Sequence, residues 1–214
     1  MKLKICGITN LADARYVAAA RADYLGFIQY AGSPRHIDAS AAAEIIEWVF
    51  GPQTVGVFVD ADAEQINEAA KTAGFDLVQL HGNETVETCR AVHFPVIKAL
   101  RVSAGDEVRD LRQRLNVYVG AVDYFLLDTY DDARKGGTGK SFDWTVARVL
   151  AQEFPIFLAG GITPENAAEA CRSVVPYGLD VSSGLESEPG RKDYAKVDAF
   201  FAALRTEGII EEYE

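Results

Sequence analysis

Two residues that can carry protons stand at the ends of short apolar runs in this sequence. Cys6 ends the run at residues 2–6, and Asp128 follows Phe125-Leu126-Leu127. A cysteine beside cationic groups is partly thiolate and can accept a proton, and Lys4 can supply such a charge if it shares a face with Cys6. Burial raises the pKa of a carboxyl group, which suits a general acid. We therefore predict Cys6 as a base and Asp128 as an acid, although a lone cysteine is more often a packing residue.

Two glycine-containing turns are candidates for binding phosphate. Gly160-Gly161 comes just before an expected helix, and Ser182-Ser183-Gly184 ends another strand-like run. Glycine lets backbone N–H groups approach phosphate oxygens closely, and a helix N-terminus adds a favourable dipole. Either turn alone would be explained as a tight connection. The two together favour a substrate site formed by Gly160, Gly161, Ser182, Ser183 and Gly184.

Three other polar residues each have two interpretations. Asp180 lies inside a strand-like run, where it could form a buried ion pair with Lys4 or contact a substrate. His81 stands alone at the end of a run and is expected to position or pack rather than to catalyse. Arg35 is a surface arginine by default, and a ligand with a second anionic group would make it a binding residue.

The segment at 136–141 resembles the end of a nucleotide-binding P-loop. That motif needs a further glycine five residues before Gly139, and Arg134 occupies that position. We therefore reject nucleotide binding and expect a flexible loop beside Asp128 instead.

These residues need a scaffold, and the chain alternates strand-like with helix-like segments. Short apolar runs predict strands at 2–6, 24–29, 54–59, 77–80, 96–100, 124–127, 156–159 and 179–182. Amphipathic segments predict helices near 10–21, 38–49, 62–73, 83–92, 104–115, 142–152, 163–173 and 191–205. Asn10 is an expected N-cap, and Thr163-Pro164 offers a cap followed by proline at the first helical position.

This alternation predicts an α/β fold, specifically a closed (β/α)8 TIM barrel of parallel strands. An open doubly wound sheet is less favoured because no GxGxxG motif follows the first strand. In a barrel the active site lies at the carboxyl ends of the strands, and the loops after strands seven and eight often hold a phosphate. We expect one catalytic domain over residues 1–205 and an acidic tail over 206–214.

The composition limits the possible partners. A formal net charge of −11 disfavours nucleic acid and anionic membranes, and an anionic substrate then needs a local positive site. The three cysteines, Cys6, Cys89 and Cys171, show neither a disulfide framework nor a metal-ligand spacing, which fits a reducing compartment. No apolar stretch approaches the roughly 20 residues of a membrane helix, and no signal-peptide pattern opens the chain. We expect a cytoplasmic protein with no nucleic-acid or membrane partner.

An ordered series of motifs along nearly the whole chain resembles the phosphoribosylanthranilate isomerase family of tryptophan biosynthesis. No single motif is specific, but together they are. They are Lys4-Ile5-Cys6-Gly7-Ile8-Thr9, Gly26-Phe27, Ser33-Pro34-Arg35, Val57-Phe58-Val59, Val78-Gln79-Leu80-His81-Gly82, Leu126-Leu127-Asp128-Thr129, Gly136-Gly137-Thr138-Gly139, Phe142-Asp143-Trp144, Gly160-Gly161-Ile162, Pro164-Glu165-Asn166, Asp180-Val181-Ser182-Ser183-Gly184 and Pro189-Gly190.

The resemblance implies an Amadori rearrangement of a phosphorylated aminoaldose to an aminoketose. It implies that Asp128 protonates the furanose ring oxygen and that Cys6 removes the proton from the sugar C2 carbon. It further implies that Arg35 holds the anthranilate carboxylate, that the turns after strands seven and eight hold the phosphate, and that no metal or organic cofactor takes part. Either a monomer or a homodimer is compatible with it.

Two positions depart from the family pattern, and other functions compete with the isomerase. Residues 29–32 are less apolar than expected, and Ala159 stands where a serine is also common. Indoleglycerol-phosphate synthase, a pentose-phosphate epimerase and the related isomerisation of histidine biosynthesis are the alternative barrel enzymes. A non-catalytic phosphosugar-binding barrel is the alternative from another class, but a binding module needs neither Cys6 nor Asp128.

Overall fold

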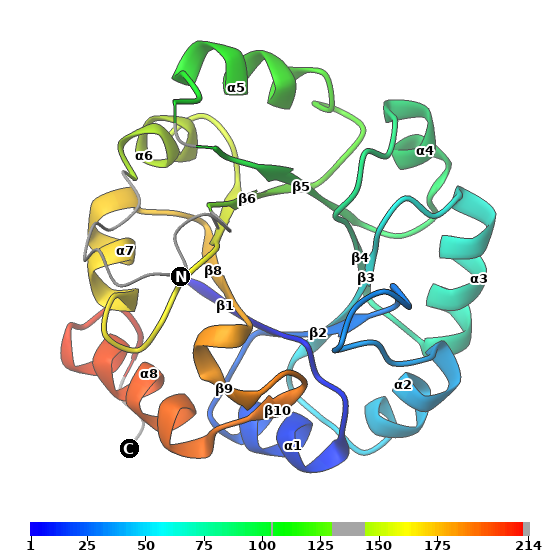
Figure 1. Cartoon of the computed structure of the whole chain (residues 1–214), viewed down its shortest axis with the longest axis vertical. Helices are drawn as coiled ribbons and strands as arrows, with labels where there is room; N and C mark the ends of the chain where they lie inside the picture. Colours follow the sequence, from blue (N-terminus) through cyan, green and yellow to red (C-terminus); the bar gives the residue numbers. More distant parts are fainter. Residues whose placement is uncertain (104, 130–143, 212–214) are drawn as a thin grey trace.

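The computed structural model describes residues 1–103, 105–129 and 144–211. Parallel strands β1 to β8 close into a barrel in sequence order, and the helices surround it (Figure 1). The strands are β1 (Lys2–Cys6), β2 (Tyr24–Ile28), β3 (Gln53–Phe58), β4 (Leu77–Leu80), β5 (Val96–Arg101), β6 (Tyr124–Asp128), β7 (Ile156–Ala159) and β8 (Gly178–Val181). The helices are α1 (Leu11–Ala19), α2 (Ala39–Ile46), α3 (Ala63–Ala73), α4 (Val86–Ala91), α5 (Val108–Asn116), α6 (Thr145–Ala151), α7 (Ala167–Val174) and α8 (Tyr194–Thr206). The expected (β/α)8 barrel is therefore confirmed.

Local signals explain where these elements begin and end. The side chain of Asn10 accepts a hydrogen bond from the Asp13 N–H, so the expected cap of α1 is confirmed. A capping box formed by Asp62 and Gln65 begins α3, and Gly74 ends it in the left-handed conformation that glycine adopts without strain. No helix in the described part of the chain is long and apolar enough to cross a membrane.

Closure of the barrel brings the first and last strands side by side. Lys4 on β1 pairs in register with Asp180 on β8, and Cys6 pairs with Gly26 on β2. The barrel interior below these residues is filled by apolar side chains that include Tyr24, Phe157 and Leu126. A second, larger apolar layer lies between the strands and the helices. The filled lower interior leaves the carboxyl ends of the strands as the place for a pocket.

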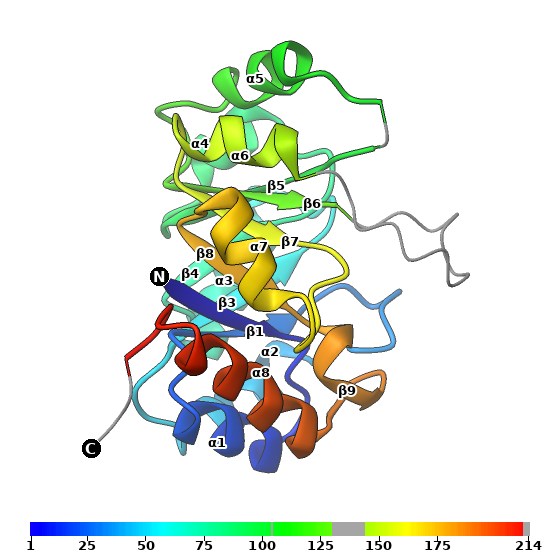
Figure 2. The ribbon, with the colours of Figure 1, turned by 90° about the vertical axis from the view of Figure 1, so that its left-hand side faces the viewer.

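Helix α8 begins at Tyr194, three residues after the expected start at 191, and the chain between β8 and α8 forms a hairpin that the sequence did not predict. After β8 it forms a short 3-10 turn, η2 (Ser183–Leu185), and then the antiparallel pair β9 (Glu186–Glu188) and β10 (Arg191–Lys192). Figure 2 shows β9 at the end of the barrel opposite the N-terminus. The hairpin therefore lies at the carboxyl ends of the strands, and it takes only the first residues of the segment that was expected to be helical.

The expected start of the seventh helix at Thr163-Pro164 is wrong. Helix α7 begins at Ala167, and residues 163–166 form a turn in which the Asn166 side chain accepts a hydrogen bond from the Thr163 N–H. The Asn166 amide also donates to the Gly161 carbonyl, so Asn166 rather than Thr163 organises this connection. Asparagine favours such turns because its side chain can form hydrogen bonds with nearby backbone groups.

Some predicted features fall on residues outside the described ranges. The loop expected at 136–141, the family motifs at 136–139 and 142–143, and the last three residues of the expected tail all lie there. Within the described part, α8 ends at Thr206, and Ile209 and Ile210 are partly buried against the core.

A buried ion pair ties the loop after β4 to β5. The Lys98 ammonium donates to Glu84 at 2.8 Å and to the carbonyls of Leu80 and Gly82 at 3.1 and 2.8 Å, and both charged side chains are almost fully buried. The Glu84 carboxylate also accepts from the backbone N–H of Asp60 and of Gly82. Both charges are thus paired and hydrogen-bonded.

Replacing Glu84 with alanine is expected to lower the free energy of unfolding by about 3–5 kcal/mol, because it leaves the Lys98 charge buried without its counter-ion. Urea denaturation measures this. The control is Glu153→Ala, which breaks a solvent-screened surface ion pair with Arg112 and should cost much less. Equal losses of unfolding free energy in the two variants would contradict the stabilising role of the buried Glu84–Lys98 pair.

Candidate active site

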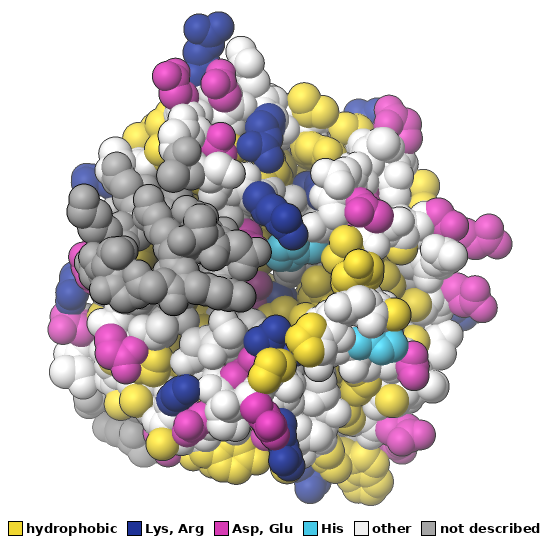
Figure 3. Space-filling model, viewed as in Figure 1, with side chains coloured by type: hydrophobic (Ala, Val, Ile, Leu, Met, Phe, Trp, Pro, Cys, Tyr) yellow, Lys and Arg dark blue, Asp and Glu magenta, His cyan; other side chains and the backbone are white. Residues whose placement is uncertain are grey.

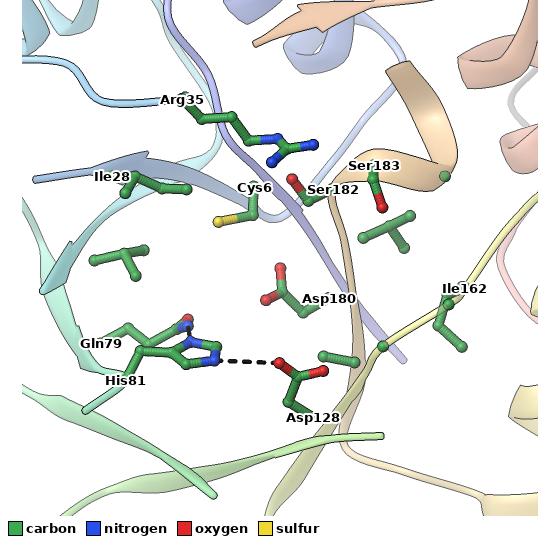
Figure 4. A pocket seen from close by; sticks show the side chains of 16 residues that line it. Cys6, Ile28, Arg35, Gln79, His81, Asp128, Ile162, Asp180, Ser182 and Ser183 are labelled. Carbon is green, nitrogen blue, oxygen red and sulfur yellow. Dashed lines mark hydrogen bonds and ion pairs between the residues drawn. The ribbon is translucent and has the colours of Figure 1, made fainter. Parts of the chain in front are cut away.

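A pocket of about 370 Å³ opens at the carboxyl ends of the barrel strands. It is lined by all of the residues that the sequence analysis proposed, namely Cys6, Arg35, His81, Asp128, Gly160, Gly161, Asp180, Ser182, Ser183 and Gly184. Figure 4 shows the side chains of Cys6, His81, Asp128 and Asp180 around one space. On this face of the molecule, Lys and Arg side chains lie beside a central hollow and also at the edge, and Asp and Glu side chains occur in both places (Figure 3). Among the described residues that line the pocket, Arg35 is the cation that an anionic substrate can meet.

Cys6 lies beside a buried ion pair. The fully buried Lys4 ammonium is 2.9 Å from a carboxylate oxygen of Asp180 and also interacts with the Cys6 thiol. Burial is the largest influence and opposes the charge on Lys4, but Asp180 and Cys6 together outweigh it, so the pKa of Lys4 is raised and the side chain stays charged. Asp180 also lines the pocket. The ion-pair interpretation of Asp180 therefore holds, and contact with a ligand remains open to it.

The pKa of Cys6 reflects two opposing influences. Burial raises it and is the largest influence, whereas the positive charges of Lys4 and Lys192 lower it and Asp180 raises it. The net result is a pKa above the ordinary value of a thiol. Cys6 in the free protein is thus mainly a thiol near neutral pH, with two cations placed to favour the thiolate when it forms.

Gly26 on the neighbouring strand makes the position of Cys6 possible. A Cβ atom on Gly26 would lie 2.7 Å from the Cys6 sulfur and 3.1 Å from the Lys4 ammonium nitrogen. Any side chain there would displace the thiol or the ion pair. The glycine of the Gly26-Phe27 motif thus leaves room for both groups.

Asp128 is part of a line of three polar side chains. One of its carboxylate oxygens is 3.3 Å from Nε2 of His81, and Nδ1 of His81 is 2.8 Å from the side-chain nitrogen of Gln79 (Figure 4). A Gln79 amide that donates to Nδ1 leaves the ring proton on Nε2, which points to Asp128. The sequence analysis did not select Gln79 as a site residue. The available signal was a polar residue inside the otherwise apolar strand β4.

Arg35 is held by a carboxylate that the sequence analysis also missed. Its guanidinium donates from Nε at 2.9 Å and from Nη2 at 2.6 Å to Glu186 on β9. The fully buried Lys192 on β10 pairs with the same carboxylate at 2.9 Å. Burial alone would raise the pKa of Glu186, but Arg35 and Lys192 outweigh it, so the pKa of Glu186 is lowered. Both partners were missed because no strand was predicted at Glu186 and Lys192 fell at the start of the expected helix at 191–205.

The glycine turns after β7 and β8 form another part of the pocket lining. Gly160 and Gly161 adopt φ values of 90° and 65°, which side chains rarely tolerate. A Cβ atom on Gly184 would lie 1.9 Å from the Ile162 carbonyl oxygen, so the two turns pack directly against each other. Ser182 Oγ is buried and has no hydrogen-bond partner within the described residues. These turns therefore offer backbone N–H groups and a hydroxyl to an anion.

The fold and the pocket together define a (β/α)8-barrel enzyme with its active site at the carboxyl ends of the strands. Residues 3–203 match the family model described as "N-(5'phosphoribosyl)anthranilate (PRA) isomerase", and the chain belongs to this family. The resemblance identified from the motifs and the expectation of an isomerase are therefore confirmed.

Individual relatives agree with this assignment. The isomerase of Geobacter sp. strain M21 is 47% identical over 205 residues, which are 95% of this chain and 98% of the relative. The crystal structure of the Thermotoga maritima isomerase is 37% identical with a TM-score of 0.85, and the match covers 98% of this chain and 100% of that one. An isomerase crystallised with reduced 1-(o-carboxyphenylamino)-1-deoxyribulose 5-phosphate is 36% identical with a TM-score of 0.83, covering 96% and 99% of the two chains.

Proposed function

We propose that this protein converts N-(5'-phosphoribosyl)anthranilate into 1-(2-carboxyphenylamino)-1-deoxyribulose 5-phosphate, with Asp128 as general acid and Cys6 as general base. The observation that carries the proposal is that these two groups line one pocket from different strands, β6 and β1. Family membership supports the substrate. No metal or organic cofactor is part of the proposal.

The reaction proceeds in two proton transfers. Asp128 gives its proton to the furanose ring oxygen while the bond between that oxygen and C1 breaks, and the nitrogen lone pair forms the C1=N bond of a protonated Schiff base. The Cys6 thiolate then removes the proton from C2, and the released electron pair neutralises the nitrogen to give an enolamine. Tautomerisation of the enolamine to the ketone completes the isomerisation.

The two charged ends of the substrate are assigned to different groups of the pocket lining. Arg35 binds the anthranilate carboxylate, and the turns that contain Gly160, Gly161, Ser182, Ser183 and Gly184 bind the phosphate. The ligand of the related crystallised isomerase carries both a carboxyphenyl and a phosphate group. Arg35 was expected to bind substrate only if the ligand has a second anionic group, and a ligand of this kind has one.

Replacing Arg35 with methionine is expected to raise KM about 10-fold to 100-fold with a smaller change in kcat, because a charge-assisted contact to the substrate carboxylate is lost. The loss of phosphoribosylanthranilate fluorescence in a steady-state assay measures both constants. The control is Arg112→Met, which removes an exposed arginine on α5 that pairs with Glu153. A folded wild-type protein without turnover would overturn the proposed function, whereas an unchanged KM in Arg35→Met would overturn only the role of Arg35.

A further inference from the structure

We propose that the buried pair Glu186–Lys192 is a positioning device that sets both the Arg35 guanidinium and the main chain at Cys6. The inference rests on the proposed function, because it assigns a task to groups that hold the two proposed working residues. Both members of the pair come from the β9–β10 hairpin. One short hairpin thereby connects the carboxylate-binding group to the proposed base.

Glu186 determines the orientation of Arg35. Its carboxylate accepts hydrogen bonds from Nε and from Nη2 of the guanidinium, and its own side chain is 3% exposed. Two bonds to a planar fork fix both its position and its plane. The guanidinium has more N–H donors than one carboxylate can use, and Arg35 lines the pocket. Glu186 thus presents the remaining donors toward a ligand.

Lys192 holds the chain at Cys6. Its ammonium donates to the Cys6 carbonyl oxygen at 2.6 Å and to Glu186 at 2.9 Å, and it is fully buried. Gly7 follows Cys6 with φ 80°, and a Cβ atom there would lie 2.8 Å from Arg35 Cδ and 3.2 Å from a Glu186 carboxylate oxygen. The chain at Cys6 therefore passes directly against the Arg35–Glu186 pair.

The pair also affects the charge that faces the thiol. Three cations and two carboxylates from the surrounding elements lie around Cys6, and His81 and Asp128 stand across the pocket. The five groups are Lys4 on β1, Asp180 on β8, Glu186 on β9, Lys192 on β10 and Arg35 after β2. The excess of one positive charge favours the thiolate of Cys6. Removing Lys192 would cancel that excess.

Two buried variants and one exposed control test the proposal. Glu186→Gln keeps the shape of the side chain and should raise KM about tenfold, because Arg35 loses its charged partner. Glu188→Gln is the matched control, since Glu188 lies on the same hairpin in an exposed pair with Arg191. A KM in Glu186→Gln equal to that of Glu188→Gln would overturn the proposal for Arg35.

The second measurement follows the thiol without substrate. The rate of Cys6 alkylation by iodoacetamide is measured against pH by mass spectrometry of the Cys6 peptide. In Lys192→Met the curve should move to higher pH by about one pH unit. In Lys192→Arg, which keeps the positive charge, the curve should lie close to that of the wild type. A curve that coincides with the wild type, or Lys192→Arg behaving as Lys192→Met does, would overturn the proposal for Cys6.

These measurements separate the positioning device from the proposed function. Alkylation needs no turnover, so it reports on Lys192 even if Cys6 proves not to be the base. Circular dichroism and thermal melting show whether each variant is folded, and Glu186→Gln provides the test by itself if Lys192→Met does not fold. In that case, a KM of Glu186→Gln above that of Glu188→Gln supports the positioning of Arg35, and an equal KM overturns it.

Discussion

Replacing Asp128 with asparagine is expected to lower kcat about 10²–10⁴-fold while the barrel stays folded. Asparagine has the same shape and can still accept a hydrogen bond from Nε2 of His81, which lies 3.3 Å from Asp128. It cannot release a proton to the furanose oxygen, so ring opening should become limiting. Since the loss falls on the transition state rather than on substrate binding, KM should change much less than kcat. The fluorescence assay with saturating substrate measures this effect.

A second aspartate provides the control for this variant. Asp38 has a side chain that is 79% exposed, and Asp38→Asn should retain the activity of the wild type. A kcat of Asp128→Asn within a few-fold of the wild type would show that another group supplies the proton. The proposed acid would then be wrong, although the substrate assignment would stand.

Replacing Cys6 with serine is expected to lower kcat by a similar factor, about 10²–10⁴-fold. A hydroxyl group is a far weaker acid than a thiol, so almost no alkoxide is present to remove the C2 proton. Binding of a product analogue should persist because the side chain changes little in size. Cys89→Ser is the control, since Cys89 is also buried but lies on α4 and does not line the pocket. Turnover by Cys6→Ser at the wild-type rate would remove Cys6 from the mechanism.

The raised pKa of Cys6 adds a pH dependence to this second prediction. Burial holds the pKa above the ordinary value of 9.0, so the thiol is the main species in the free protein near neutral pH. A base must be deprotonated to act, and the thiolate fraction rises as the pH rises toward that pKa. We therefore expect kcat/KM to increase with pH on the alkaline side of neutrality. A decline over the same range would contradict a thiolate base.

The fold and much of the site follow from local features of the sequence. The short apolar runs predict each of the eight barrel strands to within about two residues, because strand formation depends on neighbouring side chains that a sequence displays directly. Once those strands are assigned to a barrel, Cys6, His81, Asp128 and the glycine turns must meet at one end, since parallel strands share their direction. The cap at Asn10 is equally local. These are the features that sequence alone determined.

Competition between local signals limited the prediction at two places. Thr163-Pro164 has the residue types of a helix start, but Asn166 binds the Thr163 N–H and the Gly161 carbonyl, so the helix begins later. The segment after β8 has few apolar residues, and no element was predicted for residues 183–190. It pairs instead as a hairpin against the site, and the sequence displays no strong period there.

Only the tertiary structure decided which charges meet. The pair of Lys4 and Asp180, separated by 176 positions, was one of two interpretations of the sequence, and the register of β1 against β8 confirms it. Arg35 meets Glu186 across 151 positions, and Lys192 reaches the Cys6 carbonyl across 186. The sequence shows that each of these residues is charged, but the partner of a buried charge depends on which distant strands the closed barrel brings together. The electrostatics of the site are therefore a property of barrel closure, because local sequence determines strands and helices but not the register between distant ones.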